Sequence, residues 1–315
     1  MKRIIGQYGG LRPGPLVIMI GAIHGNEPAG VQALQEVFKQ LNEADPARQL
    51  APFQGKLIGI IGHCQAFQTG QRFLEQDLNR MWLSATVRQI LAKNRKDLRE
   101  EELEIRELCD LIQEAVQANL PETLVILDLH TTSAAGGVFC IPTDEMASLD
   151  LARALHAPVI LDLLKGIQGP LLAYAAEGNF VQDGWPRQTL GVAFEAGQHV
   201  NPHSVSRSTS AAMHCLRAVG CLPMEGPEQD FDRILEQYSA GLPKVSRLLH
   251  VHRVQPGDQF RMRPGYLNFQ RVRKGEHLAD DVRGAVQAPC DGLILMPLYQ
   301  SQGSDGFFLV GPEEE

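Results

Sequence analysis

The sequence predicts an α/β protein with a mostly parallel, mixed sheet between two layers of helices, followed by a smaller β-rich domain. Through residues 15–219, apolar runs of strand length alternate with segments of helical periodicity, and this alternation is typical of a parallel sheet covered on both faces. After about residue 225 the pattern changes to short β-like pieces separated by Gly, Pro and Asp. We therefore expect one domain over residues 1–225 and a β-rich C-terminal domain over residues 240–315.

The first unit of strand, loop and helix follows directly from the pattern of apolar residues. Residues 15–23 (PLVIMIGAI) are almost all apolar, as is typical of a strand that is buried on both faces. The run ends at the polar segment 24–28 (HGNEP), in which Pro28 suits the first turn of a helix. Apolar residues then recur at helical spacing at Val31, Leu34, Val37, Phe38 and Leu41.

Further strands and helices follow with the same alternation. Apolar runs predict strands over residues 56–62, 124–129, 138–141, 158–163 and 191–194, and helical periodicity predicts helices over residues 96–119 and 203–219. We interpret the charges on one face of helix 96–119 as a solvated surface. No internal repeat or low-complexity tract interrupts the pattern.

Composition and charge exclude several classes of partner. The 315 residues are 44% apolar and 21% charged, as in an ordinary soluble protein. With 29 basic and 37 acidic residues the net charge is −8, so the chain has no overall attraction to nucleic acid or to an anionic membrane. No apolar run approaches the roughly 20 residues that a membrane helix needs. We expect no nucleic acid and no membrane partner, and a small-molecule substrate instead.

The cysteines and the N-terminal sequence favour the cytoplasm. The first residues, MKRIIGQYGG, lack the apolar stretch and cleavage site of a secretion signal. The six cysteines are scattered along the chain without a CxxC pair, which is typical of reduced thiols in a core.

Three polar clusters lie at the ends of predicted strands, where ligands bind in open parallel sheets. They are His24 with Glu27, then His130, then Glu195. Two His and one Glu with an open fourth position form a catalytic rather than a structural zinc set. Asp128 is a candidate hydrogen-bond partner of His130, with a backbone carbonyl as the alternative. Each residue alone also has a structural interpretation, so the prediction of a zinc site depends on their combination.

The loop that follows the predicted strand over residues 56–62 carries Arg72, Asn79 and Arg80. Arginine offers a planar fork that fits a carboxylate, so this loop is a candidate clamp for a carboxylate on the substrate. The alternative is that Arg80 pairs with a structural acid such as Asp77. Glu195 is a candidate general base and acid, a role typically worth about 10²–10⁴-fold in rate, with an ion-paired structural acid as the alternative.

Four short motifs carry a resemblance to a known family. They are GAIHGNE (21–27), DLNR (77–80), DLHTT (128–132) and FEAG (194–197). With them the sequence resembles the succinylglutamate desuccinylase/aspartoacylase family, whose catalytic domain is similar to that of the zinc metallocarboxypeptidases. The resemblance covers residues 15–200 and implies a metallocarboxypeptidase-like α/β/α sandwich with a β-rich C-terminal domain.

The resemblance also implies a role for each matching residue. It implies that His24, Glu27 and His130 bind one Zn²⁺ per chain, that Arg72 stabilises the oxyanion, that Asn79 and Arg80 hold the substrate's carboxylate, that Glu195 is the general base and acid, and that a C-terminal tyrosine, Tyr299 or Tyr266, lies near the substrate. We assign this last role to Tyr299. One departure concerns specificity, because aspartoacylases have a further arginine where this chain has Trp185, and the nearest arginine is Arg187.

The residues and the resemblance together predict a zinc-dependent hydrolase that cleaves the amide bond of an N-acyl amino acid or a related small amide. Two alternatives stay open: a metallocarboxypeptidase or amidase that acts on short peptides, and a zinc-binding scaffold without catalysis. The sequence does not specify the acyl group. It does not specify the oligomeric state either, and a homo-oligomer is one alternative.

Overall fold

The computed structural model describes residues 1–44, 53–223 and 230–313. Its strands are β1 (Ile4–Gly9), β2 (Leu16–Gly21), β3 (Lys56–Ile61), β4 (Thr123–Thr132), β5 (Phe139–Pro142), β6 (Val159–Leu161), β7 (Gln188–Gln198), β8 (Val245–Arg253), β9 (Arg261–Met262), β10 (Gln270–Val272), β11 (His277–Asp281), β12 (Gly284–Gln287), β13 (Gly292–Leu295) and β14 (Asp305–Pro312). Its helices are α1 (Ala29–Ala44), α2 (Cys64–Thr69), α3 (Ser84–Ala92), α4 (Glu100–Asn119), α5 (Met146–Ala154), α6 (Leu171–Ala176), α7 (Ser204–Ala218) and α8 (Asp230–Ser239).

The centre of the molecule is a mixed, mostly parallel sheet. Within the described residues it has eleven strands in the order β1-β3-β2-β4-β7-β5-β6-β8-β14-β13-β10. Strand β2 pairs in parallel with both β3 and β4, and β4 pairs in parallel with β7. Strands β1 and β5 are antiparallel to their neighbours β3 and β7. The predicted α/β/α sandwich with a mostly parallel sheet is confirmed.

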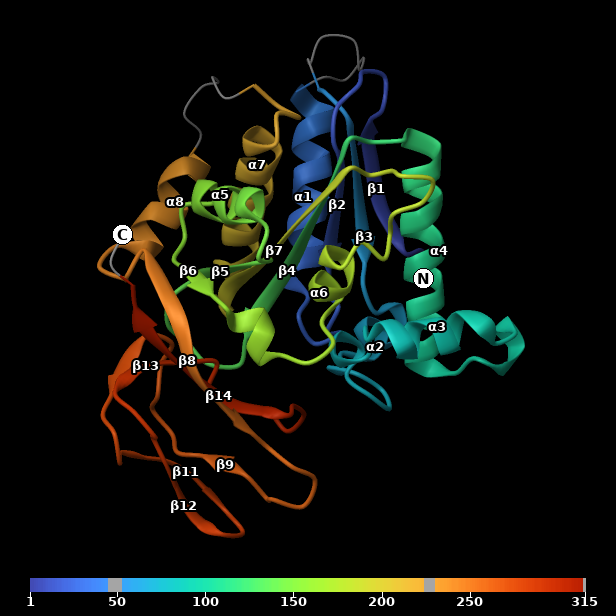
Figure 1. Cartoon of the computed structure of the whole chain (residues 1–315). Coiled ribbons are helices and arrows are strands. Elements are labelled where there is room, and N and C mark those ends of the chain that lie inside the picture. The colour runs from blue at the N-terminus through green and yellow to red at the C-terminus, as the bar shows by residue number, and fades with distance from the viewer. Residues whose placement is uncertain (45–52, 224–229, 314–315) are drawn as a thin grey trace.

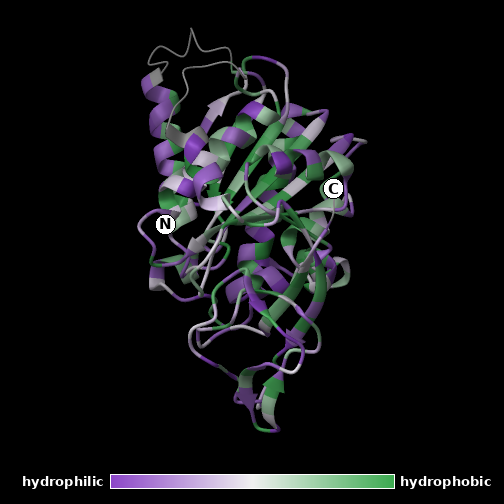
Figure 2. Cartoon of the chain, turned by 90° about the vertical axis from the view of Figure 1, so that its left-hand side faces the viewer, coloured by the Kyte–Doolittle hydropathy of each residue, from purple (hydrophilic) through white to green (hydrophobic). Residues whose placement is uncertain are grey.

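Strand β2 shows why this sheet needs helices on both faces. Val17 and Met19 pack into the core beneath α1 and α7, whereas Ile18 and Ile20 pack into the core beneath α3 and α4. Successive side chains of a strand point to opposite faces, so a strand in the middle of two cores must be apolar throughout. Figure 1 shows α1 and α7 on one side of the sheet and α4 on the other, and Figure 2 shows hydrophobic residues concentrated on the sheet between them.

The C-terminal strands extend the same sheet and then leave it. Strand β8 pairs in parallel with β6, and β14, β13 and β10 follow in antiparallel order. Strands β12, β11 and β9 form a separate three-stranded sheet, drawn at the bottom of Figure 1. The division into domains 1–225 and 240–315 stays a prediction, and its boundary at residue 225 lies outside the described residues.

The structure differs from the sequence prediction in ways that concern the site. Strands β4 and β7 continue to Thr132 and Gln198, so His130 and Glu195 lie within strands rather than just after them. Glu101 and Glu104 of α4 are both buried, which corrects the interpretation of its charged face as entirely solvated.

No helix in the described part of the chain is long and apolar enough to cross a bilayer, and the cytoplasmic location stays a prediction.

Candidate active site

Two elements bring together the three candidate metal ligands. His24 and Glu27 lie in the short loop between β2 and α1, and His130 lies near the end of the adjacent strand β4. The loop is packed tightly against α2, because a Cβ on Gly25 would lie 2.2 Å from the carbonyl carbon of Ala66. A glycine at this position lets the loop turn the imidazole and the carboxylate toward His130.

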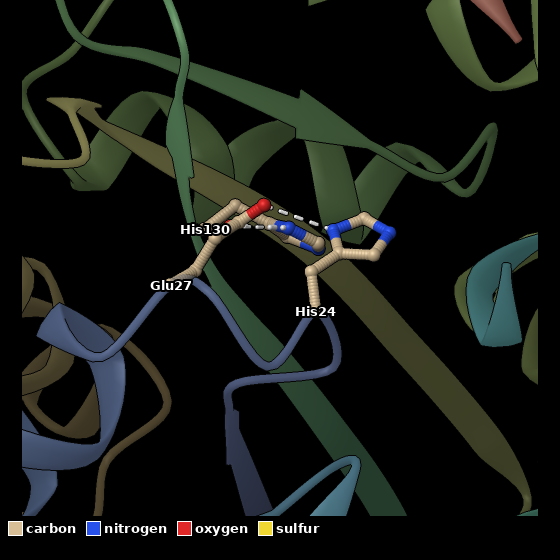
Figure 3. A group of neighbouring side chains, drawn as sticks. All are labelled: His24, Glu27 and His130. Carbon is tan, nitrogen blue, oxygen red and sulfur yellow. Dashed lines mark hydrogen bonds and ion pairs between the residues drawn. The ribbon is translucent and has the colours of Figure 1, made fainter. Parts of the chain in front are cut away.

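The three side chains converge in a buried cluster, here called the metal cluster (Figure 3). Glu27 Oε1 lies 3.0 Å from His24 Nδ1, and Glu27 Oε2 lies 3.2 Å from His130 Nδ1. The backbone N–H of Thr131 donates to Glu27 Oε2 at 2.8 Å. One nitrogen from each imidazole and one carboxylate oxygen all lie within 4.8 Å of one another. The predicted trio therefore has the donor types and the spacing that suit a zinc ion.

Two aspartates hold the imidazoles in this orientation. His24 Nε2 lies 3.0 Å from Asp77 Oδ1, and His130 Nε2 lies 2.9 Å from Asp128 Oδ2. A carboxylate that accepts the Nε2 proton leaves Nδ1 free to bind a metal and makes it more basic. Asp128, rather than a backbone carbonyl, orients His130, because residues two apart in a strand point to the same face.

Electrostatics favour a cation at the metal cluster. Burial opposes ionisation of Glu27, but the charges and hydrogen bonds of His24 and His130 hold its pKa well below the ordinary range. Burial likewise disfavours charge on His130, but Asp128 and Glu27 raise its pKa well above the ordinary value. The proton that this raised pKa keeps on His130 compensates the neighbouring carboxylates in the metal-free protein, and a bound metal would take its place.

Glu195 lies beside the metal cluster on β7, directly opposite His130 in the strand register. Its side chain is buried, and its Oε2 has no hydrogen-bond partner among the described residues. Burial, together with the negative charges of Glu27 and Asp128, raises its pKa to about 8 against the opposing effects of His130 and Arg72. A buried carboxyl group that can exchange a proton near neutral pH is suited to general acid–base chemistry.

Arg72 joins the metal cluster to the loop that follows α2. Its guanidinium donates to Glu27 Oε1 at 3.3 Å and to Asp77 Oδ2 at 3.1 Å. Asp77 also accepts the backbone N–H of Asn79 at 3.0 Å, which starts the short 3₁₀ helix Leu78–Arg80. Arg72 therefore lies where its N–H groups border the same cavity as the metal cluster.

Asn79 and Arg80 border the cavity from this 3₁₀ helix. Asn79 Oδ1 accepts the backbone N–H of Leu171 at 2.9 Å, which leaves the amide nitrogen for other contacts. Arg80 donates to Asp305 Oδ2 at 2.6 Å. The acid that pairs with Arg80 is thus Asp305 of β14 and not Asp77, which binds His24 and Arg72 instead.

Tyr299 is not brought together with the other predicted residues. Its hydroxyl donates to the carbonyl of Arg263 and accepts the backbone N–H of Tyr266, and it does not line the cavity. Its neighbour Gln300 does line the cavity. Arg187 also lies elsewhere, over the ring of Trp185 at 4.6 Å.

One cavity contains the other seven predicted residues, namely His24, Glu27, Arg72, Asn79, Arg80, His130 and Glu195. A group of apolar residues that the sequence does not predict as part of the site lines the same cavity. It is here called the apolar wall and consists of Ile141, Leu164, Ile167, Leu172, Ala193 and Phe308. These residues come from separate strands, helices and loops. In the sequence they are indistinguishable from the residues of an ordinary core.

Comparison with known proteins establishes the family. A model of the succinylglutamate desuccinylase/aspartoacylase catalytic domain matches residues 13–182. The chain belongs to this family. This match confirms the predicted family. Its members are deacylases that hydrolyse amide bonds. The metal cluster and Arg72 both lie within the matched segment, whereas Glu195 lies beyond it.

Individual relatives agree with this assignment. The chain is 30% identical over 125 residues to a probable aspartoacylase of Nostoc sp., a match that covers 40% of this chain and 38% of the Nostoc protein. It is 26% identical over 274 residues to a succinylglutamate desuccinylase of Pseudomonas syringae, which covers 84% of this chain and 73% of that protein.

Solved structures share the fold across nearly the whole chain. The succinylglutamate desuccinylase of Vibrio parahaemolyticus superposes with a TM-score of 0.62 at 18% identity, over 96% of this chain and 83% of that chain. Murine aminoacylase 3 superposes with a TM-score of 0.59 at 18% identity, over 95% of this chain and 96% of that chain. At this identity the likeness concerns the fold, and it includes the C-terminal strands.

Proposed function

We propose that the protein is a zinc-dependent hydrolase that cleaves the amide bond of an N-acyl amino acid or a related small amide. The observation that carries the proposal is the position of Glu195. Its Oε2 has no hydrogen-bond partner among the described residues, and Glu195 lines the same cavity as a trio of His24, Glu27 and His130 spaced for a metal. In amide hydrolysis, water adds to the acyl carbon, the C–N bond breaks, and the products are a carboxylate and an amine.

His24, Glu27 and His130 would hold one zinc ion per chain. Bound zinc supplies Lewis acidity that polarises a carbonyl group and lowers the pKa of water. Asp77 and Asp128 keep the two imidazoles turned toward that position. Three protein donors would leave one coordination position for water or substrate, as in catalytic rather than structural zinc sites.

Glu195 and Arg72 supply the remaining groups that the reaction needs. Glu195 accepts a proton from the attacking water and then transfers it to the nitrogen of the departing amine. Arg72 donates hydrogen bonds to the carbonyl oxygen as negative charge develops there, a contribution of about 10²–10³-fold in rate. Both residues border the same cavity as the metal cluster.

A site for the substrate's carboxylate is supported by the charges around Arg80. Asp305 pairs with Arg80 and also with Arg253, so two guanidinium groups share one carboxylate and leave an excess positive charge. Arg80 Nε has no hydrogen-bond partner among the residues that the structure describes. An α-carboxylate at this end of the cavity would balance the charge and bind Arg80 directly.

The experiment that tests the proposal is the release of free amine by the zinc-loaded protein. The panel contains N-acetyl, N-formyl and N-succinyl amino acids together with unblocked dipeptides, and Glu195→Gln is the control. We expect release from N-acyl amino acids by the wild type, with kcat reduced about 10²–10⁴-fold in the variant. Release from dipeptides alone would instead establish a peptidase. No release from any compound by protein that holds zinc would favour the non-catalytic scaffold.

A further inference from the structure

The lining of the cavity has two chemically different parts. One part consists of the metal cluster, Glu195 and Arg72, and the other is the apolar wall. Within the wall, Ile141, Leu172 and Phe308 are buried. The wall residues pack into the hydrophobic core and also border the cavity, so a ligand in the cavity would contact them.

The apolar wall adjoins the place assigned to the substrate's carboxylate. The segment that precedes α6 contacts the 3₁₀ helix Leu78–Arg80: Asn79 Oδ1 accepts the N–H of Leu171, and a Cβ on Gly169 would lie 2.4 Å from the carbonyl oxygen of Arg80. Leu172 is the next residue along and belongs to the wall. This part of the wall therefore lies beside the α-carbon of an N-acyl amino acid whose carboxylate binds Arg80.

The cavity lining offers no further cationic group that could pair with an acidic side chain of the substrate. Only Arg72 and Arg80 bring a guanidinium or ammonium group to its lining within the described residues. Arg72 is bound to Glu27 and Asp77, and Arg80 would bind the α-carboxylate. A second carboxylate placed against the wall would lose its hydration without gaining a partner, which is costly.

We propose that the apolar wall binds the side chain of the amino acid, so the preferred substrates are N-acyl derivatives of leucine, methionine or phenylalanine rather than of aspartate or glutamate. This inference rests on the proposed deacylase function. Burial of a Leu or Phe side chain in a matching pocket contributes enough binding free energy for a preference of about 10–100-fold.

The direct test compares kcat/KM for N-acetylleucine and N-acetylphenylalanine with kcat/KM for N-acetylaspartate and N-acetylglutamate, so that the acyl group stays constant. We expect the apolar compounds to be preferred by about tenfold or more. Equal rates, or a preference for the acidic compounds, would overturn the inference and leave the proposed function intact.

If no compound is hydrolysed, the proposed function fails and binding decides the inference separately. Calorimetric titration of the protein with free L-leucine and L-aspartate should then show tighter binding of leucine. Tighter or equal binding of aspartate would overturn the inference about the wall.

Two neighbouring leucines provide a matched pair of variants. Leu171 and Leu172 are both buried, but only Leu172 lines the cavity. Leu172→Ala should lower the ratio of kcat/KM for N-acetylleucine to that for N-acetylalanine by about fivefold or more. Leu171→Ala should leave this ratio within about twofold of wild type. The ratio is independent of the fraction of folded protein, so an unchanged ratio in Leu172→Ala overturns the inference even if the variant is unstable.

Discussion

Two buried clusters of histidine and acidic residues lie close together in this molecule, and they differ in what their atoms contact. The metal cluster consists of His24, Glu27 and His130. The second, here called the structural cluster, consists of His63, Glu101 and Glu104 and joins α4 to the N-terminus of α2. Both clusters are almost fully buried. Composition and burial therefore do not distinguish a functional group of residues from a structural one.

In the structural cluster the polar side-chain atoms accept hydrogen bonds from backbone N–H groups. His63 Nδ1 accepts the N–H of Ala66 at 3.3 Å, and Glu101 Oε1 accepts the N–H of Leu74 at 2.7 Å. Glu104 Oε1 accepts the N–H of Gln65 at 3.0 Å. None of these carboxylates or imidazoles lines the cavity of the active site. The cluster thus holds the start of α2 and the part of the following loop just after Arg72.

In the metal cluster the same atom types face one another and the cavity. Both Nδ1 atoms point at Glu27, and Glu195 Oε2 has no partner among the described residues. The comparison teaches that convergent donor atoms beside a cavity, rather than buried charge itself, indicate chemistry.

The largest expected effect is on kcat, and it should differ between the same substitution at Glu195, beside the metal cluster, and at Glu101, within the structural cluster. Glu195→Gln should lower kcat by about 10²–10⁴-fold, because the amide cannot carry the proton. Glu101→Gln should leave kcat within about threefold, because Glu101 contacts only the scaffold. Steady-state kinetics on equally zinc-loaded proteins measures both, and equal losses in the two variants would contradict the comparison.

Arg80→Met should have the next largest effect. Removal of the guanidinium should lower kcat/KM for an N-acyl amino acid by about 10–100-fold, since a charge-assisted hydrogen bond is lost. The matching N-acyl amine without a carboxylate should be affected less than about threefold, and it serves as the control. A similar loss with both compounds would mean that Arg80 acts through the scaffold.

Glu101→Gln should lower the free energy of unfolding by about 1–3 kcal/mol. The glutamine retains one acceptor oxygen for the N–H groups of Leu74 and Glu75, but its NH₂ group would replace the second carboxylate oxygen. Urea denaturation followed by circular dichroism measures the change. Stability equal to that of the wild type would show that the structural cluster does not stabilise the fold.

The smallest expected effect is on the pH dependence of the free energy of unfolding. The pKa values of Glu195 and Glu101 are shifted in opposite directions. Burial raises the pKa of Glu195 to about 8 in the metal-free protein, so the folded state keeps a proton that the unfolded chain loses near the ordinary pKa of 4.5. Its contribution to stability therefore falls as pH rises through this window. Burial opposes ionisation of Glu101 as well, but His63 and the N–H of Leu74 lower its pKa, so its contribution is lost as pH falls below 4.5.

Denaturation of the metal-free proteins at pH 5 and pH 8 measures this difference. Relative to wild type, Glu195→Gln should gain about 1 kcal/mol or more of stability between the two pH values. Glu101 itself titrates below this range, but its loss also removes a cause of the raised pKa of His63, so a change in the offset of Glu101→Gln over the same range would report His63. A constant offset for Glu195→Gln would contradict the raised pKa of Glu195.

The sequence predicts the central strands and the residues at their ends because these depend on local patterns. The apolar run of β2 and the polar loop after it are enough to place His24 and Glu27 beside the end of β4. The partners of these residues depend on contacts between distant segments. Asp305 lies 225 residues from Arg80, and no local pattern links the two.

The structural cluster and the apolar wall could not be predicted for the same reason. Glu101 belongs to an acidic run that is typical of a solvated helix face, and only its contact with His63, 38 residues away, explains its burial. Leu172 is one apolar residue among many, and only the folded chain shows that it borders a cavity. The prediction of Tyr299 as a substrate-binding residue lacked a local motif, and its hydroxyl is engaged by Arg263 and Tyr266.

The zinc content of three proteins after extensive dialysis distinguishes the metal cluster from the structural cluster. Elemental analysis of wild type, His24→Ala and His63→Ala compares one histidine from each cluster under the same conditions. We expect one zinc per chain in the wild type and in His63→Ala, and none in His24→Ala. Zinc retained by His24→Ala, or lost from a folded His63→Ala, would contradict the assignment of His24 as a metal ligand and of His63 as a structural residue.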